Sequence, residues 1–144
     1  MIWARKNTGG SQSISATDRF DKLAADLLSA AEIDFDGSSP LQQALVATFL
    51  FGMLFADGKA NSLSAGEIRE LALVTFQNVL HYSPEAATVA IQQCIDATNP
   101  ESHDTMNAIL HRGIDGHRQN ATGDTNGLRQ NLMTILEHFA TRSN

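Results

Sequence analysis

The chain has 144 residues, enough for a single domain that buries roughly 68–70% of its unfolded surface without a disulfide or a metal. Hydrophobic residues make up 42% of it, which excludes a disordered tail protein. The single cysteine, Cys94, excludes an internal disulfide and a cysteine-based zinc cluster.

The charge balance is acidic, with 16 Asp and Glu against 10 Lys and Arg and a net charge of −6. Because phosphate binding needs Lys and Arg, this balance disfavours nucleic acid as a partner. It suits a basic protein partner, although mild acidity for solubility explains it equally well. The imbalance is sharpest between Asp18 and Asp57, where seven acidic residues accompany two basic ones.

Neither the N-terminus nor the most apolar run predicts a membrane or secretion signal. Residues 1–14 are rich in Gly, Ser and Asn, contain no apolar run typical of a signal peptide, and are expected to form a flexible segment. The longest apolar run, Ala44–Ala56, is too short to span a bilayer and is typical of a buried helix. We therefore expect a cytoplasmic protein without membrane contact.

Helical spacing of apolar residues predicts a first helix that begins at Ser15 or two residues later. Turn residues in the stretch DFDGSSP, residues 34–40, end it. Ser39 and Gln42 then form a capping box for a second helix, with proline at its first position. This second helix is apolar around most of its circumference, so we expect it in the centre of the core, ending at Asp57-Gly58.

The third helix has the clearest start signal, an S-x-x-E capping box formed by Ser64 and Glu67. The fourth begins at Ser83-Pro84-Glu85, and its small residues predict close packing against a neighbour.

Asn99-Pro100-Glu101 is typical of a helix start and predicts the beginning of a fifth helix, with Gly113 and Gly116 loosening its end. A sixth carries apolar residues at helical spacing between Leu128 and Phe139. No segment alternates with the period of a strand. The sequence therefore predicts an all-α fold, a single compact bundle of about six helices with short loops over residues 15–144.

The stretch FADGKANSLSAGEIREL, residues 55–71, resembles a cation loop at first sight. An EF-hand counted from Asp57 would place Lys59 at its third position and Ile68 at its twelfth, where oxygen ligands are required. Neither residue is a calcium ligand, so capping and turn chemistry explain this stretch better.

A metal-dependent phosphohydrolase is the strongest enzymatic alternative, because His81, His103-Asp104 and Asp124 occur in a formal H…HD…D order. Helix-dipole and turn preferences explain each of these residues without a metal. No nucleophile elbow or phosphate-binding glycine motif occurs, and Cys94 lies on an apolar stripe. We expect no catalytic residue, metal ligand or cofactor site.

The most polar organised surface is expected on the fifth helix. Asn107, His111, Asp115 and Arg118 share one stripe at helical spacing, and Arg112 lies beside it. Such a stripe is either a solvated helix face with weak ion pairs or a recognition surface, for which Arg and His beside an Asp are well suited.

Two family resemblances add to this interpretation. Ala56-Asp57-Gly58 followed by Ser64 and Glu67 resembles the signature of TerB-like (tellurite-resistance) helical domains, but the second acidic repeat of those domains is missing. That resemblance implies a stress-response or ligand-sensing module.

The second resemblance extends from about Leu45 to Arg118. FGMLFADG, the Ser-Pro-Glu helix start, CIDATNP and especially NAILHRGIDGH are similar to small all-helical immunity proteins that accompany bacterial polymorphic and type VI secreted toxins. This resemblance implies a protein that binds a cognate toxin and occludes its active site.

An immunity function predicts a toxin-binding surface rather than a catalytic site. The two candidate surfaces are the acidic turn after the first helix, with Asp34 and Asp36, and the stripe of His111, Arg112, Asp115 and Arg118. Either would meet a basic cleft of a toxin that acts in the cytosol. The broad apolar stripe near Phe49–Phe55 also leaves room for a homodimer.

Overall fold

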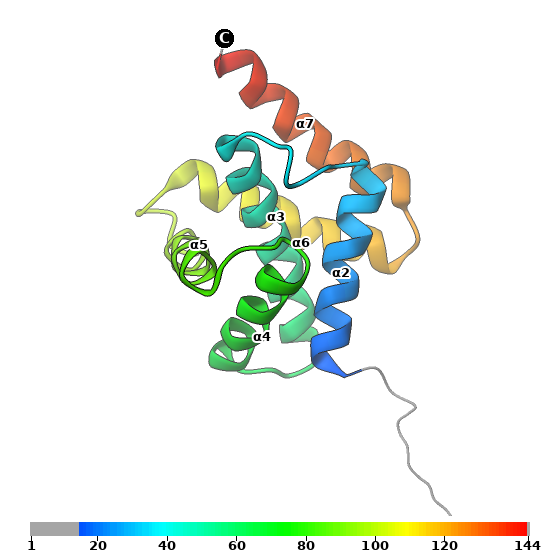
Figure 1. The fold of residues 1–144 in the computed structure, drawn as a ribbon. Coiled ribbons are helices and arrows are strands. Elements are labelled where there is room, and N and C mark those ends of the chain that lie inside the picture. The colour runs from blue at the N-terminus through cyan, green and yellow to red at the C-terminus, as the bar shows by residue number, and fades with distance from the viewer. Residues whose placement is uncertain (1–14, 144) are drawn as a thin grey trace, which may run out of the picture.

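The computed structural model describes residues 15–143, and the side chains of residues 15–140. Within this range the chain forms six helices and no strand, which confirms the predicted all-α fold (Figure 1). The expected flexible segment of residues 1–14 lies outside the described residues. The helices are α2 (Ala16–Ala31), α3 (Pro40–Ala60), α4 (Ala65–Asn78), α5 (Pro84–Asp96), α6 (Asp104–Ala121) and α7 (Thr125–Ser143).

Four of the helices begin at a serine that the sequence indicates, and for α2 this is Ser15, one of the two predicted starts. In α2, α3, α4 and α5 the hydroxyl of that serine accepts a hydrogen bond from the backbone N–H three residues later, and the serines are Ser15, Ser39, Ser64 and Ser83. Glu67 completes the capping box of α4, and its bonds to Ser64 lower the pKa of its carboxyl. Local sequence therefore determines where these helices start.

Two predicted helix boundaries are wrong. The second helix does not end at Asp57-Gly58 but continues to Ala60, because both residues are buried in the core and helical packing outweighs their turn preference. The fifth helix does not begin at Asn99-Pro100-Glu101, where the Asn99 side chain accepts from the Glu101 N–H in a turn. It begins at Asp104, with the imidazole of His103 accepting from the Met106 N–H as the N-cap.

Helix α3 is the centre of the hydrophobic core and contacts each of the other five helices. By length and composition it could cross a membrane, but 67% of its most apolar window is buried inside the domain, as expected for a core helix. Its residues from Leu45 to Leu54 are all buried. Most of the stripe considered for a homodimer is therefore covered by the chain itself, and a dimer through another surface stays a prediction.

The most extensive helix contact is the crossing of α3 and α6 in the middle of the molecule (Figure 1). Gly52 of α3 and Gly113 of α6 meet there. A Cβ at Gly52 would overlap the carbonyl oxygen of Leu110, and one at Gly113 would overlap that of Phe49. The expectation that Gly113 and Gly116 loosen the end of this helix is thus wrong: both are buried inside it and allow close approach.

We predict that Gly113→Ala lowers the free energy of unfolding by about 3 kcal/mol or more, because the added methyl group meets backbone on a second helix and cannot be accommodated by a side-chain rotation. Gly66→Ala is the matched control. Gly66 is exposed on α4 with only the Ser64 hydroxyl within 4.0 Å, so helix propensity should make that change stabilising by roughly 0.5–1 kcal/mol. Urea unfolding of both variants measures the two effects, and equal shifts would contradict this account of the crossing.

Candidate functional site

The acidic turn between α2 and α3 presents both predicted carboxylates to solvent. Asp34 accepts a long hydrogen bond of 3.3 Å from the Gly37 N–H. Asp36 lies 3.1 Å from Nδ1 of His81, and both side chains are about two-thirds exposed. A role in offsetting the helix dipole would require His81 to lie in the last turn of a helix. It lies instead beyond the end of α4, with a positive φ of 65°. The turn is thus tied to the α4–α5 connection.

The predicted stripe on α6 is only partly available to a partner. His111, Asp115 and Arg118 are exposed, and the last two form an ion pair of 3.8 Å. Arg112 instead turns inward, donating to the backbone carbonyl of Asn131 on α7 at 3.1 Å, while the Asn131 amide donates back to the Arg112 carbonyl at 3.0 Å. Arg112 therefore joins two helices.

A shallow groove of about 400 Å³ lies between α6 and α7 at this stripe. Arg112, Asp115 and Arg118 line it, but His111 does not. The acidic turn does not contribute to this groove, since neither Asp34 nor Asp36 lines it.

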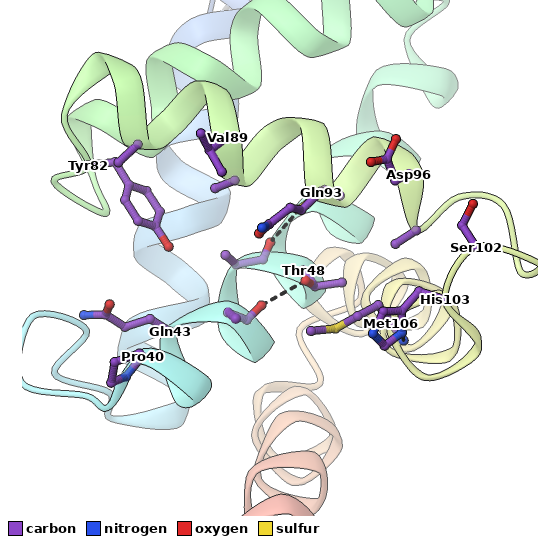
Figure 2. A pocket seen from close by; sticks show the side chains of 16 residues that line it. Pro40, Gln43, Thr48, Tyr82, Val89, Gln93, Asp96, Ser102, His103 and Met106 are labelled. Carbon is purple, nitrogen blue, oxygen red and sulfur yellow. Dashed lines mark hydrogen bonds between the residues drawn. The ribbon is translucent and has the colours of Figure 1, made fainter.

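A larger groove of about 760 Å³ lies between α3, α5 and the start of α6 (Figure 2). Alanines and other small or apolar side chains dominate its walls. The lining residues are Pro40, Gln43, Ala44, Ala47, Thr48, Tyr82, Ala86, Val89, Ala90, Gln93, Cys94, Asp96, Ala97, Ser102, His103 and Met106. We name it the α3/α5 groove.

Sequence reasoning missed the α3/α5 groove, although the signal was present. The small residues of α5 predict close packing, and Ala87 and Cys94 do pack into the core. Ala86 and Ala90, however, line the groove instead of closing it, because their methyl groups do not reach across to α3. A run of small residues is compatible with a tight interface and with a hollow, and the pattern alone does not distinguish them.

The floor of the groove has little unsatisfied polarity. The Thr48 hydroxyl donates to the Ala44 carbonyl of its own helix at 2.8 Å (Figure 2). Cys94 is 2% exposed, and burial raises the pKa of its thiol to about 12, against a small opposing effect of a hydrogen bond with Thr48. Burial also raises the pKa of the Tyr82 hydroxyl at one end of the groove. The floor thus presents neutral, mostly apolar groups.

A buried ionic cluster links α2, α3 and α6 near the other end of α3. Asp57, 7% exposed, accepts from Nε of Arg19 on α2 at 2.6 Å and lies 3.2 Å from Nε2 of His117 on α6. Both carboxylate oxygens of Asp57 are thus bonded to side chains of other helices. The prediction that capping and turn chemistry explain this stretch is therefore wrong at Asp57. Among the described residues, the one buried side-chain nitrogen or oxygen without a hydrogen bond is Nη2 of Arg19.

The residues of the formal H…HD…D order have separate structural roles. His81 pairs with Asp36, His103 caps α6, and Asp124 accepts from the Gly127 N–H at the start of α7. Over the part of the chain that the structure describes, no three His, Cys, Asp or Glu residues are grouped as metal ligands would be.

The model of the Immunity protein 48 (Imm48) family matches residues 17–140. The chain belongs to the Imm48 family. No curated protein and no solved structure matches the chain. Membership implies an immunity protein directed against a toxin, which is a class of proteins that generally act by binding rather than by catalysis.

The Imm48 match extends from the first turn of α2 far into α7, so it includes the α3–α6 crossing, the Asp57 cluster and the α3/α5 groove. The family match thus covers nearly all of the helical body.

We predict that Asp57→Ala lowers the free energy of unfolding of this Imm48 protein by about 2–4 kcal/mol, because it leaves the largely buried Arg19 without its carboxylate. The control is Asp115→Ala, which removes an exposed pair with Arg118 and should cost less than about 0.5 kcal/mol. Chemical denaturation compares the two. A similar small effect at both positions would show that the cluster adds no stability.

We predict that Cys94 reacts with Ellman's reagent at pH 8 more than 100-fold slower in the folded protein than in urea, since both burial and the raised pKa suppress the thiolate. The unfolded thiol ionises at its lower, ordinary pKa. Stability that depends on Cys94 therefore falls as pH rises from that value toward about 12, and Cys94→Ala should remove this part of the pH dependence. Rapid labelling of the folded protein would contradict the buried position.

Proposed function

We propose that this Imm48 protein binds a cognate secreted bacterial toxin in the cytosol and neutralises it by covering the toxin's active site. The single observation that carries the proposal is the family match over residues 17–140. Occlusion requires a stable surface of complementary shape and charge and no chemistry from the immunity protein itself.

The fold supports this mode of action because a rigid scaffold of packed helices holds its surfaces in place. The four serine caps, the α3–α6 crossing and the Asp57 cluster fix the helices relative to one another. A surface that is already ordered loses little conformational entropy on binding, which favours tight complexes.

The charge of the chain supports a basic partner. A net charge of −6 and exposed carboxylates at Asp34 and Asp36 provide long-range attraction for a basic cleft, which raises the association rate more than it slows dissociation. Asp36 pairs with His81, whereas the Asp34 carboxylate accepts a long hydrogen bond of 3.3 Å from the Gly37 N–H. Asp34 is therefore held less firmly within the protein and is more available to a partner.

The proposal is tested by co-producing this chain with the catalytic domain of a secreted toxin encoded beside its gene in the producing bacterium. We expect growth to be restored when the toxin is directed to the cytosol, and a one-to-one complex on gel filtration. Protection only against a periplasmic form would overturn the cytosolic assignment. Absence of both protection and a complex would overturn the immunity function for that pair.

We predict that Asp34→Asn lowers the association rate with that toxin about 3- to 10-fold at low salt, because it removes one charge while keeping an acceptor for Gly37. Glu70→Gln is the matched control, since it removes an exposed charge from α4. Surface plasmon resonance at low and high salt measures the effect. An effect of the same size at both positions would mean that the acidic turn does not face the toxin.

A further inference from the structure

The α3/α5 groove combines an exposed apolar lip with a buried floor. Val89 on α5 is 58% exposed, more than Leu41 and Val74, the other exposed large hydrophobic residues in the part of the chain that the structure describes. Val89 lines the groove, while Leu41 and Val74 do not. Several further wall residues are exposed, among them Ala86 and Gln93, so the groove is open to a macromolecule along α5.

The chemistry of the floor favours an apolar side chain over a small polar ligand. Small-molecule sites hold their ligands with a few polar groups aimed into the cavity. Here the Thr48 hydroxyl donates to its own helix, Cys94 is a buried neutral thiol, and five alanines line the groove beside them. An apolar side chain of a partner that enters the open groove would bury its surface there without leaving a polar group of the floor unpaired.

One polar group at the end of the groove is available for a partner. The hydroxyl of Tyr82 forms no hydrogen bond with any described residue, and Figure 2 shows it pointing into the space between α5 and α3. Its ring is fixed by an edge contact with Phe35 and a stacked contact with Phe76. A rigid, half-buried tyrosine with a free hydroxyl is typical of the residues that dominate binding energy.

The charge around the groove indicates the character of the partner. Asp96 lines it, and none of the described residues that line it is a Lys or an Arg. The groove also adjoins the acidic turn, because the Gln43 amide donates to the Phe35 carbonyl at 2.8 Å and Phe35 touches Tyr82. An apolar segment that carries Lys or Arg is therefore complementary to the groove and to the turn together.

We propose that the α3/α5 groove is the surface that holds the toxin, and that its occupant is an amphipathic helix of the toxin with apolar residues over Val89 and a basic residue beside Asp96. The inference rests on the proposed immunity function. The 13 residues of α5 give it a length of about 20 Å, enough to pair with a helix of three to four turns. The α6 stripe would then lie outside the centre of the interface.

The decisive variant is Val89→Asp, with Val74→Asp as its matched control on α4. Both change an exposed valine on a helix surface, so both should fold, which circular dichroism and the unfolding midpoint verify. With the catalytic domain of the adjoining gene's toxin as the probe, we expect Val89→Asp to weaken binding at least 100-fold and to abolish protection. Val74→Asp should remain within about 3-fold of the unmodified chain.

A second variant tests the groove without changing its shape. Tyr82→Phe removes a hydroxyl that has no partner among the described residues, so the unfolding midpoint should not change. We expect a 3- to 10-fold weaker complex, the usual effect of one lost hydrogen bond. Hydrogen–deuterium exchange should show slower exchange in α5 on toxin binding.

The outcomes separate the two proposals. If the unmodified chain binds and protects but Val89→Asp does so equally well, the groove is overturned and the immunity function stands. Equal losses in Val89→Asp and Val74→Asp would also overturn the groove. If the unmodified chain neither binds nor protects, the immunity function itself fails for that toxin.

Discussion

The backbone contact between Gly52 and Gly113 is the constraint on which the other helix positions depend. Because no Cβ separates the two helices there, α3 and α6 cross closer than side chains would allow, and α3 can be covered on all sides. Helices α2, α4, α5 and α7 then pack around the pair. A wider crossing would move the start of α6 away from α3, and with it the wall of the α3/α5 groove that His103 and Met106 form.

The Asp57 cluster acts on the same two helices from one turn further along α3. Asp57 follows Gly52 by five residues, and His117 follows Gly113 by four, so the ionic contact lies beside the glycine contact on both helices. Arg19 adds α2 to the pair. Close backbone approach determines the distance between α3 and α6, and the cluster fixes their rotation and register, which apolar packing specifies less sharply.

The parts of the structure that were predictable from sequence are those determined by neighbouring residues. A serine cap needs only the backbone N–H three residues later, so the starts of α3, α4 and α5 were predicted correctly from Ser39, Ser64 and Ser83. Ser15, which caps α2, was one of two predicted starts. The misinterpreted positions are determined by residues far away in the chain. Gly113 has the sequence signature of a helix end and Asp57 that of a helix stop, but their partners lie 61 and 60 residues away.

The same distinction applies to the candidate binding surfaces. Charges on a turn or a helix face are visible in the sequence, so the exposed positions of Asp34, Asp36, His111, Asp115 and Arg118 were predictable. The inward position of Arg112 was not, because it depends on Asn131 of another helix. The α3/α5 groove is harder still to predict, because it is the space that the short alanine side chains of α5 leave open against α3.

The acidic turn and the α3/α5 groove, as proposed binding surfaces, would make two different contributions to toxin binding that sequence patterns merge. Exposed carboxylates act over roughly a Debye length and determine how often a basic partner arrives in the right orientation. An apolar groove acts only on contact and determines how long the partner stays. The acidic turn and the α3/α5 groove meet at Phe35 and Tyr82, so a toxin guided to the turn would arrive at the end of the groove. On this view the acidity of the chain guides the encounter, while the small residues of α5 provide the space in which the complex becomes tight.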